Sequence, residues 1–169
     1  GYLSCLSQFF FIILTMTITT LTTQEYETKT LEQRVVEWTQ AYVNALTENY
    51  KQYRINMHSR NILNPRADLS DYAKQQLKGI EDGTEKLMQF QIKSGKKYYK
   101  IIQCDFRNGE YQSGSVTAFV DKKTGQVYKP ASWKSPAKHV RFDMRIINER
   151  NYIHNPKNTD WAGGHLYMR

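Results

Sequence analysis

The sequence is poor in cysteine, with Cys5 and Cys104 as the only two among its 169 residues. Two cysteines so far apart form neither a disulfide framework nor the closely spaced pairs of a zinc site. Cys104 follows Ile101 and Ile102 in an apolar run, so we expect it to be a small buried side chain. This cysteine usage is typical of a protein that works in a reducing cell interior.

The chain also lacks the residue patterns that mark common catalytic and cofactor sites. It has no glycine-rich phosphate loop, no cysteine–histidine pair in a motif context and no cluster of carboxylates. A base such as His139 could pair with Asp121 or Asp143, but any basic protein offers such pairs. His139, His154 and His165 lack the spacing of metal ligands, so we expect structural or surface roles for them. An enzyme is the least expected class, and we predict no catalytic residue, no metal and no cofactor.

A long hydrophobic run is missing as well. The most apolar stretch, Phe9–Leu14, is far shorter than the roughly 20 residues that a spanning helix needs. Residues 1–15 contain no Lys or Arg, so they lack the basic start of a secretory signal. Met16 opens a stretch typical of an ordinary soluble N-terminus. We interpret residues 1–15 as an upstream-translated, non-native leader, with a membrane anchor as the weaker alternative, and residues 16–169 as one domain.

Positive charge is plentiful but unevenly distributed. The chain has 24 Lys and Arg against 16 Asp and Glu, which gives a net charge of +8 at pH 7. Residues 85–145 hold 13 basic and 5 acidic side chains, so the excess lies in this segment. A local excess suggests an acidic partner such as nucleic acid, another protein or a membrane surface. The alternative is a lysine-rich sheet edge, whose charges keep it soluble and unpaired.

The first half of the chain predicts a long amphipathic helix. Between about Gln24 and Met57 the apolar positions recur at steps of three and four, which defines one helix face. We expect that face, which includes Trp38 and Tyr42, to pack into the core. His58, near the end of this helix, is expected on the surface.

A second, shorter helix is predicted after a break. The dipeptide Asn64–Pro65 disfavours helical backbone and ends the first helix or its extension. Asp68 or Ser70 can then cap a helix from Asp71 to about Ile80. Two helices therefore precede the strands.

The second half of the chain predicts strands. Four aromatic or β-branched runs have turn residues between them, namely Leu87–Ile92, Lys97–Cys104, Val116–Val120 and Gln126–Lys129. We expect hairpin turns at Gly95 and at Asp121–Gly125, and a longer connection around Asn108–Gly109. These elements predict an α+β fold, in which the long helix and the short helix pack on an antiparallel meander of about four strands.

A loop built on a tryptophan follows the last of these strands. Pro130 and Pro136 bracket Trp133, and we expect a buried ring that pins the loop to the domain. Removal of such a ring would cost about 3–5 kcal/mol. Val140–Ile147 alternates polar and apolar residues and suits a further short strand. Asp160–Tyr167 is expected to form a turn and a terminal edge segment.

An ordered string runs through these last strands and the loop. It consists of Ser-Val-Thr-Ala-Phe-Val, Asp-Lys-Lys-Thr-Gly and Val-Tyr-Lys-Pro-Ala-Ser-Trp-Lys-Ser-Pro-Ala-Lys-His-Val-Arg, between Ser115 and Arg141. Over Ser115–Phe142 the chain resembles a family of small, uncharacterised proteins of tailed bacteriophages, especially marine and cyanobacterial ones. Lys97–Ile102 and Asp160–Tyr167 resemble the same family. The chain differs at Thr117, where family members often carry His, so any role of that His is absent here.

The resemblance implies a phage-associated protein, either virion-associated or accessory, in the cytoplasm of an infected bacterium or in the virion, and not secreted. Our first hypothesis is that it acts without catalysis, by binding an acidic phage or host protein through a basic surface on the β half. The alternative is a nucleic-acid-binding module that uses the same surface and stacks bases on Tyr98, Tyr99 or Trp133. The predicted aromatic anchors are Tyr128 and Trp133, and the predicted basic residues are Lys122, Lys123, Lys129, Lys134, Lys138, Arg141 and Arg145.

Overall fold

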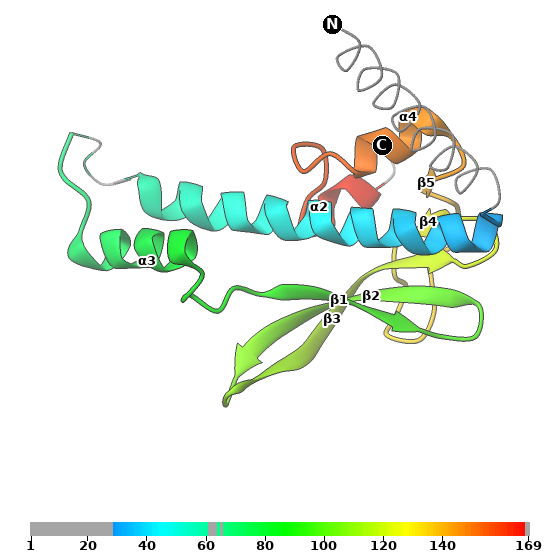
Figure 1. The fold of residues 1–169 in the computed structure, drawn as a ribbon, viewed down its shortest axis with the longest axis horizontal. Helices are drawn as coiled ribbons and strands as arrows, with labels where there is room; N and C mark the ends of the chain where they lie inside the picture. The colour runs from blue at the N-terminus through cyan, green and yellow to red at the C-terminus, as the bar shows by residue number, and fades with distance from the viewer. Residues whose placement is uncertain (1–28, 61–63, 65, 168–169) are drawn as a thin grey trace, which may run out of the picture.

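The protein folds as a long helix that lies across an antiparallel sheet (Figure 1). The structure is a computed structural model, and it describes residues 29–60, 64 and 66–167. The predicted leader (residues 1–15), the predicted helix start at Gln24 and Pro65 of the predicted break lie outside the described residues. Within the described residues, the predicted α+β class with a long helix, a short helix and an antiparallel sheet is confirmed.

The long helix, α2, spans Leu31–Ser59. Its first turn is a capping box, in which the Thr30 hydroxyl accepts from the Gln33 amide and the Gln33 side chain accepts from the Thr30 amide. The spacing of three and four places one apolar stripe in the core, and the fully buried members include Val35, Tyr42 and Leu46. The predicted core face is therefore correct.

A short helix, α3, packs against the C-terminal half of α2 (Figure 1). It spans Asp71–Asp82, and the Ser70 hydroxyl caps it by accepting from the Ala73 amide, one of the two caps predicted. This contact overturns one prediction, because His58 is buried. The ring of Tyr72 lies edge-on to the imidazole of His58, with 5.9 Å between the ring centroids. Tyr72 of α3 covers the face of α2 that carries His58, whereas the neighbouring Met57 is exposed.

The sheet has five antiparallel strands in the order β1-β2-β3-β4-β5. They are β1 (Gln89–Ser94), β2 (Tyr98–Arg107), β3 (Glu110–Asp121), β4 (Gln126–Tyr128) and β5 (Phe142–Asp143). The further short strand after the loop is thus present, although it has two residues. Buried side chains of β1 to β4 pack with those of α2 in one core cluster. Cys104 is buried in β2, as predicted.

The predicted longer connection between the two hairpins is wrong. Arg107 and Glu110 pair directly, so a two-residue turn joins β2 to β3. Asn108 and Gly109 have φ angles of 53° and 84°, the left-handed conformations that a tight hairpin turn requires. The Asn-Gly dipeptide does form the turn, but β3 follows it directly and no longer connection separates the two strands. β3 therefore starts at Glu110 and not at Val116.

The turn between β3 and β4 forms as predicted and also contacts the long helix. The Asp121 carboxylate accepts from the amides of Lys123 and Thr124, at 2.9 and 3.1 Å. Gly125 has a φ of 71°, and a Cβ there would lie 3.2 Å from Cγ2 of Val35. Gly125 is needed for its backbone conformation and for the close approach of α2.

The C-terminal segment does not form the predicted terminal edge of the sheet. It contains a helix, α4 (Ile147–Ile153), and a single 3-10 turn, η1 (Gly164–Leu166). Ile153 and Leu166 are fully buried in the core cluster. Apolar contact with the core, which short-range patterns do not reveal, therefore holds this segment against α2.

Candidate functional site

The structure gives the seven predicted basic residues different roles. Arg141 is committed to the chain itself: its guanidinium donates to the carbonyls of Leu166, Lys138 and His139. Arg145 forms a two-point ion pair with Asp143, with a closest N–O distance of 2.6 Å. The hydrogen bond from Arg145 lowers the pKa of the Asp143 carboxyl, against the opposing effect of burial. The side chains of both arginines are therefore already paired within the chain.

The predicted lysines divide in a similar way. The ammonium of Lys122 donates to the Ser94 hydroxyl at 2.6 Å and lies 4.9 Å from the centroid of the Tyr99 ring. Lys129 lies 4.5 Å from the centroid of the Tyr167 ring. The side chains of Lys123 and Lys138 are exposed. Lys134 belongs to a different group of cations, which sequence reasoning did not single out.

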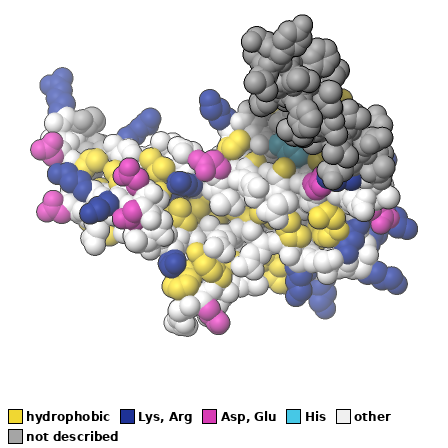
Figure 2. Space-filling view, in the orientation of Figure 1, with side chains coloured by type: hydrophobic (Ala, Val, Ile, Leu, Met, Phe, Trp, Pro, Cys, Tyr) yellow, Lys and Arg dark blue, Asp and Glu magenta, His cyan; other side chains and the backbone are white. Residues whose placement is uncertain are grey.

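That group surrounds a pocket of about 200 Å³ near the turn between β1 and β2, which we call the lysine pocket. Its lining residues are Lys93, Ser94, Gly95, Lys96, Lys97, Tyr98, Lys100, Phe119 and Lys134. Figure 2 shows several Lys and Arg side chains gathered at the end of the molecule where Figure 1 places the β1–β2 turn. The pocket therefore collects five lysines from two strands, a turn and the loop after β4.

The hairpin brings four of these lysines together. The amide of Gly95 donates to the carbonyl of Tyr98 at 2.9 Å, which closes the turn. Lys93 and Lys100 are direct cross-strand partners in the β1–β2 register. Like charges placed directly opposite each other destabilise a strand pair. Lysines at 93, 96, 97 and 100 flank the predicted turn, and this spacing could have predicted a cluster of positive charge. The sequence analysis used that segment only to predict the turn.

Few negative charges offset the lysine pocket. Lys97 lies 4.0 Å from the Asp121 carboxylate, and the pKa of Lys97 is raised, first by the Tyr98 hydroxyl and then by Asp121. Among the described residues, the ammonium groups of Lys93, Lys96 and Lys134 have no ion pair and no hydrogen bond. The pocket therefore keeps an excess of positive charge that the rest of the described chain does not neutralise.

The loop beside the pocket corrects another prediction. Trp133 is 42% exposed, so it is not the buried ring that we expected to pin the loop. The loop is braced by its own backbone instead, because the amides of Ala131 and Ser132 both donate to the Ser135 carbonyl. A β-bridge also pairs Pro130 with Pro136. The indole is left at the surface, where the ammonium of Lys100 lies 4.8 Å from its ring centroid.

The other predicted aromatic residues are partly covered. Tyr128 donates from its hydroxyl to the Gln126 side chain at 3.1 Å, and burial raises its pKa. Tyr98 packs edge-on to Phe119 and to Tyr128, and Tyr99 packs against the core cluster. Trp133 is thus the exposed member among the aromatic residues predicted for binding.

A family model described as a family of unknown function (DUF7717) matches residues 19–168. The chain belongs to this family. No curated protein and no solved structure matches it. The lysine pocket and Trp133 lie within the matched residues of this DUF7717 protein. Family membership assigns no role to either of them.

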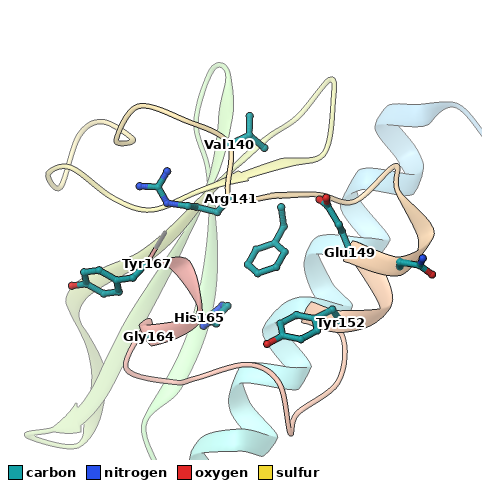
Figure 3. A pocket seen from close by; sticks show the side chains of 9 residues that line it. Val140, Arg141, Glu149, Tyr152, Gly164, His165 and Tyr167 are labelled. Carbon is teal, nitrogen blue, oxygen red and sulfur yellow. The ribbon is translucent and has the colours of Figure 1, made fainter. Parts of the chain in front are cut away.

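The DUF7717 chain has a larger pocket of about 640 Å³ beside α4 (Figure 3). Its lining includes Arg141, Glu149, Tyr152 and His165, and each of these side chains contacts another part of the chain. Glu149 accepts from the amide of Asp143 at 2.5 Å, and Arg141 donates to the carbonyls described above. The ring of Tyr152 stacks on Phe142. These bonds hold the C-terminal segment in place.

His165, which lines this larger pocket, has a structural role. Its Nδ1 accepts from the amide of Asp160 at 3.1 Å, so Nε2 carries the proton and donates to the Tyr42 hydroxyl at 2.5 Å. Burial lowers the pKa of His165 to about 4, so the imidazole is neutral at pH 7. His154 is bonded to the Trp38 carbonyl, and burial lowers its pKa as well.

Within residues 29–60, 64 and 66–167, no group of three or more His, Cys, Asp or Glu side chains is arranged to hold a metal ion. No helix in the same part is both long and apolar enough to cross a membrane.

Proposed function

We propose that this protein acts by binding, without catalysis, and that the lysine pocket and the cations around it contact an acidic partner. The observation that carries this proposal is the set of three ammonium groups, on Lys93, Lys96 and Lys134, that have no partner in the described chain. Cations placed together repel one another, and an anion bound between them removes that repulsion.

The alternative explanation is that the lysines only protect the edge of the sheet. β1 is an edge strand, and lysines on such strands prevent pairing with other chains. That explanation suits Lys93 and Lys96. It does not suit Lys100, which lies on the inner strand β2, or Lys134, which lies on the loop after β4. The convergence of both groups on one pocket favours binding.

The setting of this function stays a prediction. The resemblance of Ser115–Phe142 to tailed-phage proteins supports a virion-associated or accessory role in an infected bacterium. Mass spectrometry of purified virions from the source would test it. Absence of the protein from virions and from infected cells would contradict the phage assignment without affecting the proposed binding.

Binding can be tested with two variants of equal net charge. The triple-lysine variant is Lys93→Gln/Lys96→Gln/Lys134→Gln, which removes three charges and breaks no described ion pair. The control variant is Lys74→Gln/Lys78→Gln/Lys157→Gln, whose lysines are exposed and lie outside the lysine pocket. We expect the triple-lysine variant to elute from immobilised heparin at lower salt than the control variant. Equal elution of the two variants, or no retention of the native protein, would contradict the proposal.

A further inference from the structure

We infer that the lysine pocket binds a phosphate group of single-stranded nucleic acid and that the exposed ring of Trp133 stacks on the neighbouring base. This inference rests on the proposed function, because it names the acidic partner. It joins two features that lie side by side, namely the lysine pocket and the braced loop after β4. The lysine at position 100 lines the pocket and also lies against the indole ring.

The size and charge of the pocket suit a phosphate group. Its volume of about 200 Å³ is comparable to that of roughly six or seven waters in the liquid. That space holds one phosphate with part of its hydration shell, and it leaves the attached base outside. Lysine binds phosphate as a flexible point charge from any direction. Here Lys93 and Lys96 approach from one strand and its turn, Lys100 from the next strand, and Lys134 from the loop.

The position of Trp133 suits a base that lies next to that phosphate. The Lys100 ammonium is 4.8 Å from the indole centroid, so the ring borders the cations that would hold the phosphate. The loop keeps its conformation through the bonds to the Ser135 carbonyl, without burial of the ring. An exposed, preorganised aromatic ring loses little conformational entropy when a base stacks on it.

The combination favours a single strand over the other acidic partners. In a duplex the bases are stacked on one another, so a ring on a surface loop does not reach their faces. An acidic protein could place carboxylates in the lysine pocket, but it would not need the face of the indole. A single strand offers both a phosphate and an unstacked base. Affinity for it should therefore depend on the lysines and on the ring together.

The test is a fluorescence anisotropy titration with labelled oligothymidine and oligouridine, about 12 nucleotides long. We compare the native protein with the triple-lysine variant, the control variant, Trp133→Ala and Trp133→Leu. Poly-L-glutamate and a DNA duplex of the same length serve as competing ligands. Thermal melting of each variant confirms that it is folded. Trp133→Leu keeps an apolar side chain without an aromatic face, so it separates stacking from apolar contact.

We expect both tryptophan variants to lose about 5- to 100-fold in affinity for the single strands and to keep their affinity for poly-L-glutamate. The triple-lysine variant should bind both polymers less tightly. The slope of log affinity against log salt for the single strands should become shallower by about 0.7, because the lysine pocket holds one phosphate and each lost phosphate contact removes about 0.7. The control variant should leave this slope unchanged.

Three different results would overturn the inference. If poly-L-glutamate and the single strands bind equally well and neither tryptophan variant alters the affinity, the partner is an acidic protein, and the proposed function stands alone. If the duplex binds as tightly as the single strands, base stacking on Trp133 does not contribute to binding, and the inference is wrong while the proposed function stands. If no polyanion binds to the native protein at about 50 mM salt, both the inference and the proposed function are wrong.

Discussion

The lysine pocket and the polar residues beneath the C-terminal segment differ in whether their side chains have partners. We call the second group the tail network, which consists of Tyr42, Asn49, Asp160 and His165. Each polar group of the tail network is bonded to another part of the chain, whereas three lysine side chains of the lysine pocket have no bonded partner in the described chain. The difference indicates that the tail network stabilises the fold, whereas the proposed function assigns the lysine pocket to an outside partner.

Asn49 shows how completely the tail network is paired. Its side-chain amide donates to the Pro156 carbonyl, and its carbonyl oxygen accepts from the Trp161 amide, both at 2.9 Å. One side chain on α2 thus satisfies a donor and an acceptor of the C-terminal segment, which has little regular structure of its own. The tail keeps its position because α2 supplies the partners that a sheet or helix would otherwise supply.

The comparison is tested most strongly by Asn49→Ala. This variant leaves the Trp161 amide and the Pro156 carbonyl without their partner, so we expect a loss of about 2–3 kcal/mol in the free energy of unfolding. Urea denaturation measures that loss. Binding to immobilised heparin by the folded protein should not change. A loss below about 0.5 kcal/mol would show that water replaces the bonds and that the tail network is less important than its geometry indicates.

His165 gives the second test, through pH. The folded protein keeps His165 neutral down to a pKa of about 4, whereas the unfolded chain takes up the proton below about pH 6.5. The unfolded chain therefore binds more protons between these values, and stability falls as the pH is lowered through this window. The expected loss between pH 7 and pH 4.5 is about 2 kcal/mol.

Chemical denaturation at several pH values measures this dependence, and the variant His165→Gln is the control. The variant loses the bond to Tyr42 and is less stable at pH 7, but its stability should change less between pH 6.5 and pH 4.5. His154, whose pKa burial also lowers, titrates in both proteins and cancels in the difference. Identical pH profiles would mean that His165 is not kept neutral by the fold.

Local sequence patterns predicted the regular elements of the fold but not the contacts between distant segments. The apolar stripe of α2, the Ser70 cap and the turn at Gly125 follow from spacing and turn chemistry, which act over a few residues. The buried position of His58 depends on the packing of α3, and the position of the tail depends on Asn49. Those contacts join residues far apart in the chain, so no local pattern reveals them.

The candidate site was only partly predicted for the same reason. Lys134 was recognised in a basic segment, whereas Lys93, Lys96, Lys97 and Lys100 were assigned to a hairpin. Only the folded loop brings Lys134 to them. Arg141 and Arg145 counted equally in the sequence, but the structure commits them to carbonyls and to Asp143. Charge counts do not distinguish a cation with a partner from one without.

Trp133 provides a third test of the comparison, because we expect its aromatic side chain to contribute little to the stability of the fold. It is 42% exposed, and its loop is braced by backbone bonds. We expect Trp133→Ala to lower the free energy of unfolding by about 1 kcal/mol or less, which includes the loss of its contact with Lys100. Thermal or urea denaturation decides this. A loss of about 3 kcal/mol or more, as expected for removal of a buried ring, would mean that Trp133 stabilises the fold and would weaken its proposed role in ligand binding.

The smallest expected effect concerns the lysine pocket itself, and its direction matters more than its size. If the lysines are placed for a partner at some cost to the fold, their removal should stabilise the protein. We expect the triple-lysine variant to melt about 1–2 °C above the native protein at low salt, because Lys93 no longer faces Lys100 as a like charge. The gain should shrink as salt screens the repulsion.

The control variant should show no such gain, since its lysines are spread over α3 and the tail. A triple-lysine variant that melts below the control at every salt concentration would mean that these side chains stabilise the hairpin, and the contrast with the tail network would no longer hold.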